Sequence, residues 1–148
     1  MSEVLEVGTT IILLIGLFCF AWIDYKTQAL PVIPLLAFGL VGLLLNAFME
    51  TEWKFFSIFC VSQGMLVGVV LLLVSVLSEE SIGKGDGLLF ISTGMFLNLV
   101  ENLTLLVGTM FLIGCFSLPY LLLKKRGKKD RVAMGPFLLA AYVVFLLL

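Results

Sequence analysis

The sequence predicts an all-α fold, a polytopic membrane protein with six transmembrane helices and with both the N-terminus and the C-terminus outside. Three observations support this prediction. Of the 148 residues, 61% are hydrophobic and only 13% are charged, whereas soluble domains have about 45–50% apolar and about 25% charged residues. Apolar stretches of about membrane-spanning length recur along the chain. The basic residues lie almost entirely in alternate loops.

Hydropathy divides the chain into six apolar segments, and short polar stretches separate them. The segments are Val4–Ile23, Val32–Met49, Phe55–Leu77, Gly87–Val100, Leu103–Leu123 and Val132–Leu148. We see no internal repeat or linker, so we expect a single six-helix membrane domain over residues 1–148.

The first two segments enclose a short turn. Glu3 and Glu6 stand where a secretory signal would carry basic residues, and the apolar run that follows is too long for such a signal, so we expect a membrane helix. Asp24 follows this run directly. Pro31 comes just before the second segment, where proline suits the first turn of a helix. The sequence therefore predicts a tight return into the membrane.

The fourth segment is short. Gly87–Val100 has 14 residues, which cover about 21 Å against roughly 30 Å for the hydrocarbon core. Either this helix continues into Glu101 and Asn102, or it begins below the membrane surface. The second alternative would place Asp86 at some depth, at the positive end of the helix dipole.

The orientation follows from the distribution of lysine and arginine. With six spans, the loops after the first, third and fifth segments share one side and carry eight of the nine basic residues, and only Lys54 lies on the other side. The excess of basic residues predicts that these loops are cytoplasmic. Asp24 and Asp86 then lie on the same cytoplasmic side.

Composition also excludes several classes of function. The chain has no histidine, which rules out histidine-based zinc, haem and serine-histidine chemistry. Its net charge of −1 argues against binding of nucleic acid. Its three cysteines stand singly, with no Cys-x-x-Cys pair. We therefore expect no metal and no cofactor. The oligomeric state is left open.

Two aspartates are the candidate functional residues. A carboxylate at the edge of hydrocarbon costs several kcal/mol, so such a residue usually has a partner or a task. Each aspartate also has an ordinary structural interpretation. Asp24 would end a helix and pair with Lys26 in water, and Asp86 would be the N-cap after a glycine-rich loop. Each motif, taken alone, fits that ordinary interpretation better.

Taken together, the motifs resemble those of the type IV prepilin peptidases, the membrane aspartic proteases of the Gly-x-Gly-Asp type. Asp24 followed by Leu30-Pro31 matches the family's first aspartate, although the family more often has Ile-Pro. The second motif, Gly-x-Gly-Asp, is present as Gly83-Lys84-Gly85-Asp86, and Gly87 follows it. The stretch Gly135-Pro136-Phe137 resembles the second half of a family motif, whose first half is replaced here.

The resemblance implies that Asp24 and Asp86 are catalytic and that the substrate is a prepilin-like membrane protein, cut after a glycine at the cytoplasmic membrane face. Glu79 and Glu80 are candidates for contacting its basic leader. The chain lacks the cysteine motifs of the bifunctional members and is similar to the short, peptidase-only branch, as in tight-adherence pilus systems and archaeal preflagellin peptidases. Methyl transfer is therefore in doubt. The other partner that we expect is the lipid bilayer of a prokaryotic cell membrane.

Two other functions remain open at this point. A small transporter or proton or cation relay would also place carboxylates in the membrane, but it should carry more polar residues along its helices than this chain does. A non-catalytic assembly subunit is the third alternative, and in it both aspartates would be dispensable.

Overall fold

The structure is a computed structural model that describes residues 2–49, 54–77, 83–123 and 133–147. These residues form six α-helices, and the fold is all-α as the sequence predicts. The helices are α1 (Ser2–Thr27), α2 (Val32–Met49), α3 (Lys54–Leu77), α4 (Lys84–Gly94), α5 (Leu99–Leu123) and α6 (Gly135–Leu147).

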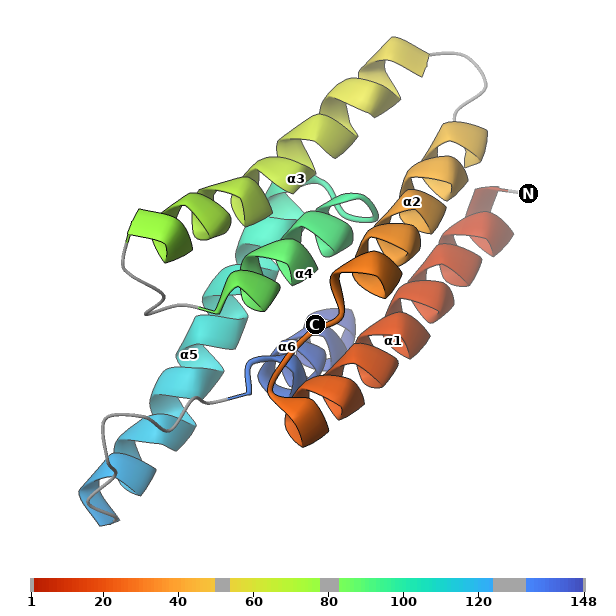
Figure 1. Ribbon diagram of the computed structural model, residues 1–148. Helices are drawn as coiled ribbons and strands as arrows, with labels where there is room; N and C mark the ends of the chain where they lie inside the picture. Colours follow the sequence, from red (N-terminus) through yellow and green to blue (C-terminus); the bar gives the residue numbers. More distant parts are fainter. Residues whose placement is uncertain (1, 50–53, 78–82, 124–132, 148) are drawn as a thin grey trace.

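The helices pack in a closed order around one core (Figure 1). Helix α1 packs against α6 and, less extensively, against α2. The short helix α4 lies between α2 and α3 and has its largest contact with α3. Helix α5 contacts α3 and α6 and so closes the arrangement. The C-terminal end of α5 projects beyond the other helices at the lower left of Figure 1.

The outer surface of this bundle is apolar, as expected for a protein surrounded by lipid. A compact core contains Leu13, Leu35, Phe90, Leu138 and Tyr142, each at most 2% exposed. Many large apolar side chains point outward instead, among them Ile33 (81% exposed), Phe48 (76%), Val100 (70%) and Phe111 (69%). Large exposed apolar surfaces mark contact with another protein or with a membrane.

Two of the six helices are long enough to support a membrane location. Within the described residues, Glu6–Thr27 and Leu99–Phe116 are long and apolar enough to cross a bilayer. Val32–Phe48, Ser62–Leu77 and Gly135–Leu147 are shorter apolar helices. The prediction of six spans and of the side on which each loop lies stays a prediction.

The predicted bounds of the fourth and fifth segments were wrong. Helix α4 ends at Gly94 and does not continue into Glu101 and Asn102. Instead, Asn98 and Glu101 begin α5: the Asn98 side chain accepts the Glu101 N–H, and the Glu101 carboxylate accepts the Asn98 N–H, both at 3.0 Å. This reciprocal pair is a capping box, which satisfies two free donors at a helix start. The fifth helix therefore starts within the predicted fourth segment, Gly87–Val100.

Helices α3 and α4 approach each other through glycines. A Cβ added at Gly68 would clash with the backbone N of Ile91, and one added at Gly64 would clash with the carbonyl oxygens of Leu97 and Gly94. Gly94 in turn lies against the backbone of Gly64. The Gly-x-x-x-Gly spacing on α3 lets the two backbones meet directly, as small residues do between membrane helices.

Candidate active site

Asp24 lies in the last turn of α1, which continues past the predicted end of the first segment. Its side chain is 5% exposed. The helix ends in a left-handed residue: Gln28 has φ 50°, and its N–H donates to the carbonyl of Asp24 at 2.8 Å. This single bond is the αL motif that closes many helices. Asp24 is therefore buried at a well-defined helix end, and the interpretation that places it in water is wrong.

The carboxylate of Asp24 is bonded to the start of α6. The N–H of Gly135 donates to Asp24 Oδ2 at 2.8 Å, in a buried position. A carboxylate at the C-terminal end of its own helix meets the negative end of that dipole. The N-terminus of α6 supplies the opposite, favourable end, together with a free donor. The contact joins two motifs that are 111 residues apart in the sequence.

At position 135, any residue other than glycine would force α6 or α1 to move. An added Cβ would lie 2.9 Å from the Cα of Ala21 and 3.1 Å from both Cβ and Oδ2 of Asp24. Because Ala21 Cα is backbone, it cannot rotate away as a flexible side chain could. The missing side chain therefore brings the first N–H of α6 within hydrogen-bonding distance of the carboxylate.

Asp86 is placed differently. It lies in the first turn of α4, and its side chain is half-buried. The N-cap is Gly83, with φ −63° and ψ 130°, so the interpretation of Asp86 as an N-cap is wrong. The Asp86 N–H donates to the Gly83 carbonyl at 3.0 Å. A carboxylate in the first turn is favoured by the helix dipole, as the sequence predicts for this position.

The glycines of the Gly-x-Gly-Asp motif serve close packing. None of them has a positive φ. A Cβ at Gly83 would lie 3.0 Å from Asp86 Oδ2, and one at Gly85 would lie 3.2 Å from the Cβ of Leu30. Gly87 is buried against α3, where a Cβ would lie 3.0 Å from the backbone N of Leu72. Gly87 thus packs against the protein's own backbone rather than presenting bare backbone to a substrate.

The contact of Gly85 with Leu30 connects the two aspartate motifs. Leu30 belongs to the turn that follows Asp24, directly before Pro31. The Pro31 carbonyl accepts the N–H of Leu35 at 3.3 Å, so proline precedes the first residue of α2 and is not within the helix. The turn therefore contacts the start of α4 on one side and continues into α2 on the other.

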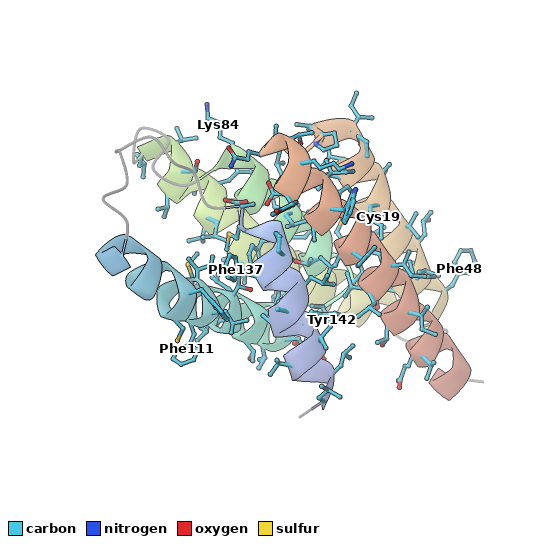
Figure 2. The ribbon with its side chains drawn as sticks, turned by 90° about the horizontal axis from the view of Figure 1, so that it is seen from below. Cys19, Phe48, Lys84, Phe111, Phe137 and Tyr142 are labelled. Atoms are coloured by element: carbon cyan, nitrogen blue, oxygen red, sulfur yellow. The ribbon has the colours of Figure 1, made fainter. Side chains whose placement is uncertain are left out.

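The side chains around these motifs differ in direction. Lys84 points away from the bundle, whereas Phe137 lies within it, on the part of α6 between α5 and α1 (Figure 2). Phe137 contacts the ring of Phe116 on α5, with ring centroids 5.9 Å apart. The Lys26 ammonium lies 5.2 Å from the centre of the Trp22 ring, an arrangement typical of a cation–π contact. Trp22 therefore provides a partner for Lys26 other than Asp24.

The remaining candidate residues lie partly outside the residues that the structure describes. Glu79, Glu80 and the basic stretch Lys124–Arg131 lie outside the described residues. Pro136 follows Gly135 in the first turn of α6, a position that suits proline. Within the described part of the chain, no group of three or more histidine, cysteine, aspartate or glutamate side chains could hold a metal ion.

Three predicted motifs thus come together through two contacts, Asp24 with Gly135 and Leu30 with Gly85. Sequence reasoning named these residues but not their pairing. It missed Ala21, whose backbone requires a glycine at position 135, and it placed Asn102 in a loop although this side chain is fully buried in α5. The Asn98–x–x–Glu101 spacing was the signal that could have located the start of α5.

Comparison with known proteins identifies the family. A sequence model of the type IV leader peptidase family matches residues 11–118, well over half of the chain, including both aspartate motifs. The match ends before Gly135, so the contribution of α6 rests on the structure. No curated protein and no solved structure matched. Members of this family are aspartic endopeptidases that act on prepilin-like proteins. The chain therefore belongs to the type IV leader peptidase family and is an aspartic endopeptidase with the apolar helices of a membrane protein.

Proposed function

We propose that this peptidase removes the leader of prepilin-like proteins by cutting after a glycine at the cytoplasmic membrane face, with Asp24 and Asp86 as its catalytic pair. The observation that carries the proposal is the buried carboxylate of Asp24, which accepts the N–H of Gly135 at 2.8 Å. An ionisable side chain buried among apolar membrane-type helices is rare and usually has a function. The family match supports the activity.

The chemistry needs two carboxylates and one water. Like charges close together cannot both ionise, so the pair holds one proton between them. The ionised member removes a proton from water, and the water oxygen attacks the carbonyl carbon of the scissile bond. The protonated member donates a hydrogen bond to the carbonyl oxygen. Collapse of the tetrahedral intermediate breaks the C–N bond, and a proton passes to the leaving amine.

The substrate is a polar, basic leader followed by an apolar helix. The apolar outer surface of the bundle suits an approach of that helix through the bilayer. Glu79 and Glu80 are the proposed contacts for the basic leader, because they precede the Gly-x-Gly-Asp motif closely. No cofactor takes part in this mechanism.

The ion-relay alternative gains no support from the described polar side chains. Ser92, Thr93, Asn102 and Thr109 are at most 1% exposed. Ser92, Asn102 and Thr109 each donate to a backbone carbonyl of their own or a neighbouring helix, at 2.6–2.9 Å. The Thr93 hydroxyl donates to Asn102 Oδ1 at 2.9 Å. Their hydrogen-bonding capacity is used within the bundle, which favours the peptidase.

The test of the activity is incubation of the purified enzyme with a prepilin-like substrate in lipid, followed by mass analysis of both products. We expect one cut, directly after a glycine, unaffected by a chelator and independent of S-adenosylmethionine. A substrate with that glycine changed to a bulky residue is the control. Loss of cleavage on chelation, restored by zinc, would contradict the two-carboxylate mechanism.

The proposed membrane orientation has its own test. Eight of nine basic residues lie on the predicted cytoplasmic side. In a variant without Cys19, Cys60 and Cys115, a cysteine introduced by Gly127→Cys should resist a membrane-impermeant thiol reagent in intact cells and react after lysis. Labelling before lysis would place the active site on the opposite face.

A further inference from the structure

The C-terminal end of α4 is held by a buried amide. Asn102 on α5 is 0% exposed, and its Nδ2 donates to the carbonyl of Gly64 on α3 at 2.9 Å and to that of Phe90 on α4 at 3.0 Å. Its Oδ1 accepts the hydroxyl of Thr93 on α4 at 2.9 Å. One side chain therefore joins three helices by three hydrogen bonds.

Helix α2 holds the same end of α4 from the other side. Asn46 Nδ2 donates to the carbonyl of Met95, directly after α4, at 2.8 Å. The Ser92 hydroxyl donates to the carbonyl of Leu35 on α2 at 2.8 Å. The first bond satisfies a carbonyl at the end of α4 in apolar surroundings, where water is scarce, and the second ties α4 to α2.

The other contacts between α4 and α3 are van der Waals contacts. Backbone meets backbone at Gly64, Gly68 and Gly94, and the side chains of Leu72 and Ile91 also lie at this glycine-lined interface. Such contacts are individually weak and not directional. The hydrogen bonds at the C-terminal end of α4, by contrast, have a preferred length and direction.

We propose that Asn102 is a positioning residue for the peptidase: by fixing the C-terminal end of α4, it sets the axial position of Asp86 relative to the Asp24 turn. Helix α4 is a short rod of 11 residues. Asp86 lies seven residues before Thr93, which is about 10 Å along the axis. A shift at one end of so short a helix is passed to the other end. This inference rests on the proposed function, because it assigns Asn102 a part in that reaction.

The first arm of the test compares kcat with KM. Asn102→Leu keeps a similar volume and removes all three bonds. Since a displacement of 1 Å in a catalytic group can cost on the order of 100-fold in rate, we expect kcat to fall about 10- to 100-fold with KM nearly unchanged. Thr109→Val is the matched control on α5: Thr109 is also 0% exposed, but its hydroxyl donates only to Leu105 of its own helix. It should leave kcat unchanged.

The second arm measures the position of α4 without any catalysis. The Cβ of Leu30 lies 3.2 Å from the place of a Cβ at Gly85, close to the roughly 3.5–4.5 Å found in disulfides. Leu30→Cys with Gly85→Cys, in a background without the native cysteines, should therefore form a disulfide on oxidation. We expect this reaction to slow several-fold when Asn102→Leu is added and to keep its rate when Thr109→Val is added.

The outcomes separate the alternatives. If Asn102→Leu keeps the wild-type kcat, or lowers kcat without slowing disulfide formation, the positioning role is overturned. If Asn102→Leu does not fold, Thr93→Val removes one of the three bonds and should show the same two effects on a smaller scale. If the wild-type enzyme cleaves no prepilin, the proposed function fails, and the disulfide arm still decides whether Asn102 fixes α4.

Discussion

The two aspartates of this peptidase are held in contrasting ways. Asp24 stands at the end of a helix of 26 residues, is 5% exposed, and is bonded to a segment 111 residues later in the chain. Asp86 stands in the first turn of a helix of 11 residues, is half-buried, and has close neighbours in the glycines of its own motif. Asp24 is held by a direct hydrogen bond from a distant part of the chain, whereas the glycines beside Asp86 bring the start of α4 close to Leu30 and to α3.

The difference indicates how each carboxylate is kept in place. Asp24 is fixed by a contact between α1 and α6 that leaves no space for a Cβ at Gly135. Asp86 moves with α4, whose ends are tied to Leu30 at the start and to the amide of Asn102 at the finish. Substitutions around the two aspartates should therefore act in different ways. A side chain added at Gly135 should push α6 away from Asp24, whereas a change at either end of α4 should displace Asp86.

The largest effect should come from the carboxylates themselves. Asp24→Asn and Asp86→Asn should each reduce cleavage by on the order of 10⁴-fold, because an amide can neither accept the proton nor carry the charge. The double variant should be no slower than either single one, since groups that act as a unit are not additive. Rates are measured on the prepilin substrate, and Glu6→Gln, an exposed acid on α1, is the control. Ready turnover by either single variant, in folded protein, would contradict the pair.

The next largest effect should come from the contact that holds Asp24. Gly135→Ala would force a Cβ against the backbone of Ala21 and against Asp24, so α6 must move away and its N–H must leave the carboxylate. We expect kcat to fall by about 10- to 100-fold. The control is Gly108→Ala, whose Cβ would make an ordinary contact of 3.6 Å with Ala141. Equal rates for the two variants would show that the Gly135 contact does not serve the reaction.

A smaller effect is expected where the two motifs meet. Gly85→Ala places a Cβ 3.2 Å from the Cβ of Leu30, so the turn must give by a few tenths of an ångström. We expect a loss of about fivefold in kcat, and Leu30→Gly in the same chain, which removes that Cβ, should restore most of it. Such a rescue corresponds to a coupling of about 1 kcal/mol between neighbours. Additive losses in the double variant would mean that the two residues do not interact.

The smallest effect should come from a polar contact away from both aspartates. Asn98→Ala removes one half of the capping box at the start of α5 and should lower the free energy of unfolding by about 1 kcal/mol. We expect kcat to be unchanged, because this cap does not bond α4. Thermal unfolding in detergent measures the first quantity. Thr104→Ala, an exposed position on the same helix, should change stability by less than about 0.5 kcal/mol.

Several helices could be predicted from the sequence because the hydrophobic effect acts on composition alone. The bounds of α2 agree with the prediction, and those of α3 differ by one residue. The predicted bounds of α4 and α5 were wrong. The break between these helices, at residues 95–98, lies within one hydrophobic run, so hydropathy does not reveal it. Asn102 was assigned to a loop together with Glu101, because two polar residues between apolar runs give the same sequence pattern whether they bind water or a buried carbonyl.

The sequence by itself determined the fold class, the family and the candidate residues, since apolar content and short motifs are properties of the chain read in order. Only the tertiary structure decided which motifs meet. The bond from Gly135 to Asp24 and the contact of Gly85 with Leu30 depend on the crossing of α1 with α6 and on the return of α2 past α4. Contacts between residues so distant in the chain are fixed by the packing of whole helices, and that packing follows from many weak interactions rather than from any local pattern.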